Sequence, residues 1–402
     1  MTTSGCASAP ERGRDEAILP SASLYLARLH DGIARTRLNM PMVIQSANIA
    51  ARRVTSGGGR LFAGGSQAEF SPELIGRAGG LACIASPPPP PQLTRRSDVI
   101  LYAAPSRLDL IDNDSIARWR EAGAYVIVFA SAALTGPNHF RPDALIDSGP
   151  SPGIPLVGGS MIPTDTTINL INAWTWVGEF VAACTRIGRT PVLYQSPDTL
   201  GAAERSDLYA GKAFHDDFAL SPIETGVLGR AYLDCIESRL LALRASINAE
   251  EIGLAAAWLR EAQPVSAAAL CTGPLYPNHF ADPRAPRRFA QVLPLVKGAS
   301  PAARFVAVFG YERPPQLQIE AAHMRRYRLF YSTVQRGSDD ASHNIVYVDP
   351  QWPEGDACVR AKGYDVRILP ASSVMQSALY WSIVAEASRP GGVMVTSKTP
   401  GE

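Results

Sequence analysis

A glycine-rich turn followed by a polar helix start is the part of this sequence best suited to hold a ligand. Gly64-Gly65-Ser66-Gln67 comes directly after a short apolar run, and Pro72-Glu73-Leu74-Ile75-Gly76-Arg77 follows it. Glycines let backbone N–H groups approach a phosphate or sugar, a serine hydroxyl can donate to it, and a helix N-terminus adds partial positive charge. We therefore take Gly64, Gly65, Ser66 and Gln67 as candidate substrate-binding residues.

A second polar stretch comes just before a predicted helix. Thr164, Thr166 and Thr167 come just before a long apolar segment from Ile168 to Cys184, which predicts a buried helix. Hydroxyls at a helix N-terminus either cap the helix or contact an anion. We assign capping to Thr164 and ligand contact to Thr166 and Thr167, while Thr164 stays a candidate for binding.

Another candidate loop follows the predicted strand Asp98 to Ala103. It reads Ala103-Ala104-Pro105-Ser106-Arg107. Ser106 offers one hydroxyl donor, and Arg107 offers a positive charge that could hold a phosphate. Both join the candidate substrate-binding residues.

The serine turn and the Pro-Glu-Leu-Ile-Gly-Arg segment together resemble the SIS (sugar isomerase) domain family. Sedoheptulose 7-phosphate isomerases of this family carry a catalytic glutamate at the offset of Glu73. The resemblance implies that Glu73 is the base of an aldose–ketose isomerisation, which moves a proton between adjacent carbons. Arg77, one helical turn later, could orient Glu73 or bind a sugar phosphate. The alternatives are a solvated carboxylate favoured by the helix dipole and an i,i+4 ion pair.

A second set of segments resembles the phosphosugar isomerase-like members of the same family. They are Ile146-Asp147-Ser148-Gly149, Pro163-Thr164-Asp165-Thr166-Thr167 and Pro191-Val192-Leu193-Tyr194-Gln195-Ser196. Together with the serine turn they extend the resemblance over about residues 22 to 200. The second half of the chain shows only the order of elements.

Two departures from the family pattern weaken the case for catalysis. Phosphosugar-binding members have a loop with several hydroxyls after the second strand, whereas here Ser106 is the one that survives. The heptose-phosphate isomerases bring a histidine from the closing helix, and no histidine lies between Ile168 and Cys184. Glu73 is therefore expected to lack its usual partner. His279 comes just past a predicted strand end, where an active-site loop could lie, but we interpret it as an exposed loop histidine.

Strand and helix signals alternate along both halves of the chain. Two opening helices are predicted before residue 55, and strands are predicted at Asp98 to Ala103 and Tyr125 to Ala130. Arg304 to Phe309 repeats the strand at Asp98, and Ser372 is expected to cap a closing helix as Thr164 does. This order predicts an α/β fold of two SIS-type, doubly wound parallel sheets flanked by helices in three-layer α/β/α order.

The predicted division of the chain has five parts. We expect a disordered tail over residues 1–20, a first SIS-like domain over 21–200, a linker over 201–226, a degenerate second SIS-like domain over 227–390 and a tail over 391–402. The halves could pair as an internal pseudo-dimer, or the chain could form a homodimer.

The composition of the chain limits the classes of partner and the cellular compartment that we expect. A net charge of +1 gives no reason to expect nucleic acid or an anionic membrane as partner. The six cysteines form no Cys-x-x-Cys pair and the N-terminus lacks the apolar region of a signal peptide, which predicts a cytoplasmic protein with reduced thiols. No histidine or carboxylate spacing indicates a metal, and we expect no cofactor.

The sequence leads to two functional hypotheses of different classes. The first is a protein that binds a sugar phosphate or related carbohydrate derivative, with isomerisation by Glu73 as a further step. The second is a non-catalytic SIS protein that acts as a sugar-phosphate sensor or as a structural, dimerising partner. A dinucleotide-binding Rossmann protein is disfavoured because no Gly-x-Gly-x-x-Gly follows a strand and opens a helix.

Overall fold

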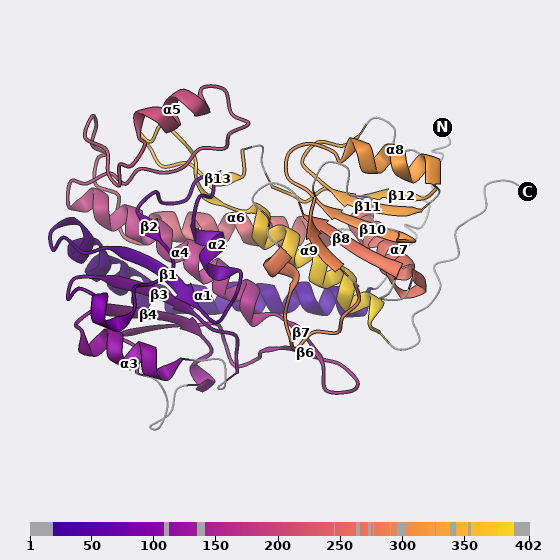
Figure 1. The fold of residues 1–402 in the computed structure, drawn as a ribbon, viewed down its shortest axis with the longest axis horizontal. Coiled ribbons are helices and arrows are strands. Elements are labelled where there is room, and N and C mark those ends of the chain that lie inside the picture. The colour runs from indigo at the N-terminus through magenta and orange to yellow at the C-terminus, as the bar shows by residue number, and fades with distance from the viewer. Residues whose placement is uncertain are drawn as a thin grey trace, which may run out of the picture.

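The computed structural model describes residues 19–389 except for 108–111, 135–140, 245, 263–265, 272–274, 276, 290, 296–302, 326, 338–342 and 353–354. Most of the loop after the strand that ends at Cys271, and most of the two predicted tails, lie outside these described residues. Two β-sheets occupy opposite ends of the molecule, and long helices lie between them (Figure 1).

The first half forms a parallel five-stranded sheet from short apolar runs. Its strands are β1 (Leu61–Gly65), β2 (Ile84–Ala85), β3 (Val99–Ala103), β4 (Tyr125–Ala130) and β5 (Ala144–Asp147), in the order β2-β1-β3-β4-β5. β3 and β4 are buried along their whole length, which explains why they read as continuous apolar runs. The chain changes direction across the sheet between β1 and β3, so this is the topological switch point.

The second half repeats this topology. Its strands are β8 (Ala267–Cys271), β9 (Gln291–Pro294), β10 (Phe305–Phe309), β11 (Arg328–Ser332) and β12 (Ile345–Tyr347), in the order β12-β11-β10-β8-β9. When the strands are numbered in chain order within each half, the first sheet read from β2 and the second sheet read from β9 both have the doubly wound order 2-1-3-4-5. Each half also has a small antiparallel hairpin before its closing helix, β6 (Gly153–Pro155) with β7 (Met161–Pro163), and β13 (Ala357–Val359) with β14 (Ile368–Pro370). The predicted fold class is confirmed.

The helices divide into a central layer and two outer layers. The central layer holds α1 (Pro20–Thr55), α4 (Asp165–Arg186), α6 (Val227–Arg244), α7 (Ser246–Ala262) and α9 (Ser372–Ala387), and the outer faces of the sheets carry α3 (Asn113–Glu121) and α8 (Gln316–Arg325). Shorter elements are α2 (Phe70–Leu74), α5 (Ala202–Leu208) and the 3₁₀ turns Pro91–Leu93, Ala132–Leu134 and Pro277–Phe280. No helix within the described ranges is long and apolar enough to cross a membrane.

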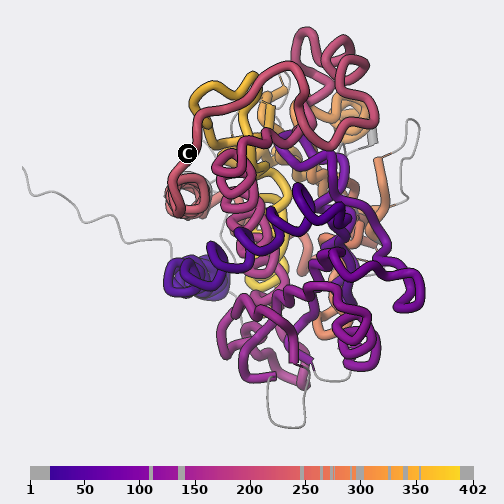
Figure 2. The backbone as a smooth tube through the Cα atoms, turned by 90° about the vertical axis from the view of Figure 1, so that its left-hand side faces the viewer, coloured from indigo at the N-terminus to yellow at the C-terminus, as the bar shows by residue number. Residues whose placement is uncertain are grey.

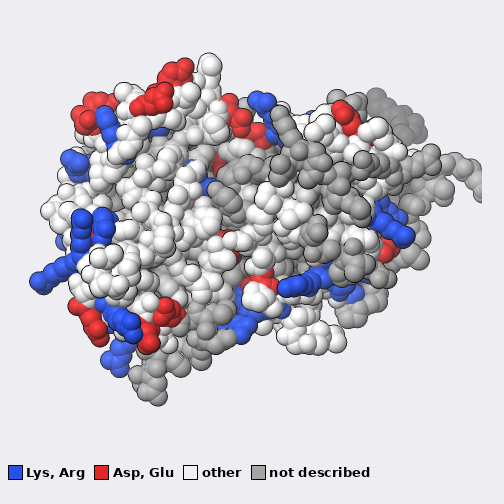
Figure 3. All heavy atoms as spheres, in the orientation of Figure 1, with Lys and Arg blue, Asp and Glu red and all other residues white. Residues whose placement is uncertain are grey.

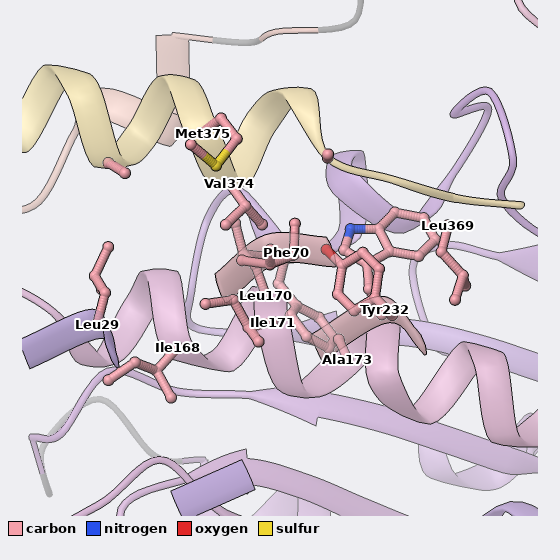
Figure 4. Packing of buried hydrophobic residues seen from close by; sticks show 14 of the residues in the cluster. Leu29, Phe70, Ile168, Leu170, Ile171, Ala173, Tyr232, Leu369, Val374 and Met375 are labelled. Atoms are coloured by element: carbon pink, nitrogen blue, oxygen red, sulfur yellow. The ribbon is translucent and has the colours of Figure 1, made fainter. Parts of the chain in front are cut away.

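Both sheets bury their inner faces in one continuous core. Val99 and Leu101 of β3 point into this core, whereas Ile100 and Tyr102 point to the outer cluster under α3, as strand alternation requires. α1 packs along α4 and α9, and α4 packs along α6, so helices of the two halves interleave (Figure 2). A close view shows α9 lying over α4, with Met375 and Val374 above Leu170 and Ile171 (Figure 4). Neither half encloses the central core alone.

Three sequence predictions about helices are corrected. The two predicted opening helices are one helix, α1, which runs through Pro41 because its buried face packs without interruption on α4. Thr164 makes no capping side-chain hydrogen bond to α4, and Ser372 is the first residue of α9, with Ala371 in the cap position. Carboxylates of Asp165 and Asp356 accept from the first amides of these helices instead.

Candidate functional site

The carboxylate of Glu73 lies at the junction of the two halves. Glu73 belongs to α2, the short helix after β1, and its side chain is 0% exposed. Trp174 Nε1 of α4 donates to Oε1 at 2.7 Å, and Ser373 Oγ of α9 donates to the same oxygen. His279 Nε2 lies 2.9 Å from Oε2 and donates to it, because an ionised carboxylate only accepts. The closing helices of both halves thus meet on one carboxylate.

Arg77 extends this junction to the hairpin of the second half. Its Nε lies 3.8 Å from Glu73 Oε2, while its Nη2 donates to Asp356 Oδ2 at 2.9 Å and to Ser372 Oγ. The other oxygen of Asp356 accepts from the amides of Ala371 and Ser372. The side chains of Arg77 and Asp356 are 1% and 0% exposed, so this is a buried ion pair across the two halves.

The buried charges compensate one another. Burial alone would raise the pKa of Glu73, but the Arg77 charge and the hydrogen bonds from His279 and Ser373 outweigh it and lower that pKa. Burial raises the pKa of Asp356, with Arg77 opposing the rise. A lowered pKa makes the Glu73 carboxylate a weaker proton acceptor than an ordinary glutamate. Glu73 is arranged as a stable anion.

Glu73 and His279 are counterparts in the internal repeat. Glu73 lies eight residues after Gly65, the last residue of β1, and His279 lies eight residues after Cys271, the last residue of β8. The prediction that His279 is an exposed loop histidine is wrong, since it is 3% exposed. The 3₁₀ turn Pro277–Phe280 carries it inward to the junction because Phe280 packs into the core beside it.

Arg77 and Arg284 are counterparts of the same kind. Arg77 reaches from the first half to Asp356, and Arg284 reaches from the second half to Asp165 at the start of α4. Arg284 binds Asp165 in two parallel contacts of 2.8 Å each, Nη1 to Oδ2 and Nη2 to Oδ1, and its side chain is 4% exposed. Asp282 also pairs with Arg284. Each closing helix therefore begins at a carboxylate held by an arginine of the other half.

The predicted binding residues gather at the switch point of the first sheet. Ser66 is exposed just beyond β1, and Gln67 is buried with its Nε2 donating to Glu69 Oε1 and to Thr166 O. Asn169 of α4 donates to Gln67 Oε1 at 2.9 Å and to Ala104 O at 3.1 Å. These bonds join the loop after β1, the loop after β3 and the first turn of α4.

Backbone geometry explains the glycine pair. Gly65 has φ +127°, and a Cβ there would lie 2.0 Å from Ala103 O of the neighbouring strand. At Gly64 a Cβ would meet the ring of Pro88 at 2.5 Å. The turn after β1 therefore needs glycine for close packing, whether or not a ligand binds there.

The remaining predicted residues are less open to a ligand. Thr164, Thr166 and Thr167 are buried, and Thr167 Oγ1 lies 3.2 Å from the hydroxyl of Tyr25. Ser106 and Arg107 are half-buried, and Ser106 N donates to Asp165 Oδ2 at 2.6 Å. At the start of α4, the backbone amides of Ser106 and Thr166 could bind an anion, but they already donate to the carboxylate of Asp165.

The surroundings of this edge are acidic. Burial raises the pKa of Glu69 to about 8, and the nearby Asp282 and Asp165 add to the rise. The exposed charges of the molecule, by contrast, are mixed in sign over the face that Figure 3 shows. Acidic groups accept hydrogen bonds from sugar hydroxyls but repel a phosphate. Arg284 already pairs with Asp165 and Asp282, so Arg107 is the candidate cation that would have to offset this repulsion.

Sequence reasoning missed the residues that surround Glu73. Trp174, Ser373, Asp356 and Arg284 carry no motif of their own, and each reaches the junction from a separate element. One signal was available. The segment Glu73-Leu74-Ile75-Gly76-Arg77 aligns with His279-Phe280-Ala281-Asp282-Pro283-Arg284 when both are counted from the end of the preceding strand, with one extra residue in the second.

A cleft of about 250 Å³ lies next to the junction. Its lining comes from the segment after α2, from the exit of α4, and from the β13–β14 hairpin, and includes Gly79, Tyr194, Ser196, Gly355 and Arg367. Neither Glu73 nor any predicted binding residue lines this cleft.

Comparisons with known proteins found only distant similarity, to solved structures. No family model matches the chain, and no curated protein matches it. A "Putative sugar binding protein" from Salmonella typhimurium LT2 is 11% identical with a TM-score of 0.44, over 90% of this chain and 98% of that one. A "putative phosphosugar isomerase" from Clostridium difficile 630 is 7% identical with a TM-score of 0.45, over 89% and 91%.

The architecture itself fits the family resemblance seen in the sequence. Two parallel five-stranded sheets of the same strand order, each flanked by helices, match the α/β architecture predicted from the sequence.

Proposed function

We propose that this chain is a tandem SIS-type protein that binds a sugar phosphate or related carbohydrate derivative at the first switch point and does not isomerise it. One observation carries the second part of the proposal: the Glu73 carboxylate is buried and held by Trp174, His279 and Ser373. A general base must reach a C–H of the sugar, so such a carboxylate would first have to leave its partners.

Support for binding comes from the position of Ser66 and of the loop after β3. Ser66 and the loop with Ser106 lie at the carboxyl ends of β1 and β3, where ligands of doubly wound sheets bind. Gln67, Asn169 and Glu69 supply amide and carboxyl groups of the kind that recognise sugar hydroxyls. Arg107, in the loop after β3, is the candidate cation for a phosphate at this edge.

A thermal-shift screen of the purified full chain tests binding. The panel holds aldose and ketose phosphates, amino-sugar phosphates and the same sugars without phosphate. A ligand at about a hundred times its dissociation constant adds roughly 2.7 kcal/mol, which raises the melting temperature by a few degrees. We expect a shift that Ser66→Ala and Thr166→Ala remove and that Ser56→Ala, an exposed change at the end of α1, leaves intact.

Proton exchange on the bound sugar tests conversion. The sugar that gives a shift is incubated with the protein in heavy water, and deuterium uptake at the carbon next to the carbonyl is followed by NMR. We expect none above the uncatalysed rate. Uptake that disappears in Glu73→Gln would establish an isomerase and overturn the non-catalytic part, whereas no shift with any sugar at millimolar concentration would overturn binding.

A further inference from the structure

Two cysteines form a thiol pair outside the site described above. Cys235 lies on α6 and Cys358 lies on β13, two elements that pack against each other. Both are half-buried free thiols, and a hydrogen bond joins their side chains. The sequence separates them widely, so only the fold brings them together.

An arginine places its positive charge beside one of the two sulfurs. Arg239, one turn after Cys235 on α6, places Nε 3.2 Å from Cys235 Sγ. Its Nη1 donates to Gln351 O at 2.6 Å, which holds the guanidinium in place. A neighbouring cation and a thiol donor both stabilise a thiolate, and the thiolate is the reactive form of cysteine.

The two sulfurs therefore differ in protonation. The hydrogen bond from Cys358 lowers the pKa of Cys235 to about 6 against the opposing effect of burial, and Arg239 and Arg367 lower it further. The same hydrogen bond and burial raise the pKa of Cys358. By comparison, burial raises the pKa of Cys83 and of Cys271 to about 12. At neutral pH the pair combines a thiolate with a thiol, which is the pairing that oxidation chemistry uses.

We propose that Cys235 and Cys358 form a peroxide-sensitive dithiol that closes to a disulfide. The Cys235 thiolate attacks one oxygen of hydrogen peroxide, the O–O bond breaks, and the released hydroxide takes a proton to become water. The resulting sulfenic acid then reacts with the Cys358 thiol, whose sulfur forms the S–S bond as a second water leaves. Two sulfurs are oxidised by two electrons while one peroxide is reduced to two waters. A dithiol reductant reverses the step by thiol–disulfide exchange.

The location gives the disulfide a structural consequence. Cys358 lies two residues after Asp356, the partner of Arg77, and its Sγ contacts Leu369 O at 3.3 Å. A bond to Cys235 would tie the β13–β14 hairpin to α6 beside the junction. This inference does not depend on sugar binding, because neither thiol belongs to the proposed ligand site.

Peptide mapping of the full chain tests the disulfide. The reduced protein is treated with hydrogen peroxide, remaining thiols are blocked, and the digest is analysed by mass spectrometry without reduction. We expect one cross-linked peptide pair joining Cys235 to Cys358, lost after reduction. In Cys358→Ala we expect a Cys235 sulfenic acid that dimedone traps at least severalfold more than in the unaltered chain. Cross-links that join Cys235 to another cysteine, or the absence of any, would overturn the proposal.

Alkylation rates test the role of Arg239 without needing oxidation. Iodoacetamide labelling of Cys235 is followed against pH, with Cys83, another half-buried thiol, as the internal control. For Cys235 we expect the labelling rate to reach half its maximum near pH 6. In Arg239→Gln we expect a higher midpoint and labelling several times slower at about pH 5.5, because at that pH the rate depends mainly on the fraction of thiolate. An unchanged midpoint in Arg239→Gln, or equal labelling of Cys83 at pH 5.5, would contradict the arrangement.

Discussion

Glu73 Oε2 and His279 Nε2 lie 2.9 Å apart although 206 positions of sequence separate the two residues. They occupy the same position in the two repeats, counted from the ends of β1 and β8, so the contact joins equivalent points of the two halves. Breaking a buried pair by removing one partner costs about 3–5 kcal/mol, because it leaves a charge without compensation. A residue placed in this way is constrained by stability as well as by any chemistry.

The Arg284–Asp165 pair predicts a large loss of stability when its cation is removed. Arg284→Met leaves the Asp165 carboxylate buried without its two contacts of 2.8 Å, so we expect the free energy of unfolding to fall by about 3–5 kcal/mol. Urea unfolding measures it. As a control, Arg328→Met breaks an exposed pair with Glu261 and should cost less than about 1 kcal/mol. Equal losses in the two variants would show that the buried pair has no special role.

Glu69 predicts a decline in stability as pH rises. Its pKa is raised to about 8 in the folded chain, whereas an unfolded glutamate titrates near 4.3. The folded state therefore binds the proton more tightly, and this contribution is full below about pH 4.3 and lost as pH rises towards 8. Urea unfolding between pH 5 and 8 should show stability falling by at most about 1.4 kcal/mol per pH unit relative to Glu69→Gln. Parallel curves for the two proteins would contradict this.

Glu73 predicts the opposite dependence in acid. Its pKa is lowered by Arg77, His279 and Ser373 against burial, so its contribution is present above about pH 4.3 and lost as pH falls through the lowered value. Between pH 5 and 3 the unaltered chain should lose more stability than Glu73→Gln, which has no proton to take up. Far-ultraviolet circular dichroism in urea at each pH measures the difference, and an identical acid dependence would count against an ionised Glu73.

The shared core predicts that neither half is soluble as a monomer. In residues 1–200, α1 and α4 would expose the faces that pack on α9 and α6. We expect this fragment to dimerise or aggregate in light scattering, and co-expression with residues 201–402 to restore a one-to-one complex. A monodisperse, monomeric fragment would show that the halves are independent. The predicted boundary at residue 200 remains a prediction that the same experiment examines.

The sequence predicted the layers of the fold better than the site. Runs such as Tyr125–Ala130 are buried on both faces, so their apolar character alone identifies a parallel strand. Short strands with mixed composition, such as β11 at Arg328–Ser332, were missed because pairing within the sheet, and not local preference, makes them strands.

The junction could be predicted only in part, because its contacts are long-range. The serine turn indicated the edge where the loops after β1 and β3 meet the start of α4, and spacing indicated that Arg77 lies near Glu73. The family pattern places a histidine on the closing helix, where in this chain Trp174 contacts Glu73 instead. His279 comes from the other repeat, and only packing of the two halves brings it to the carboxylate.

A double-mutant cycle on Glu73 and His279 tests the central claim most directly. Urea unfolding of the unaltered chain, Glu73→Gln, His279→Gln and the double variant gives the coupling energy between the two side chains. If Glu73 joins the halves, each single change lowers the free energy of unfolding and the coupling is at least about 1 kcal/mol. Single variants as stable as the unaltered chain, with additive effects, would contradict the account and return Glu73 to the role of a free catalytic base.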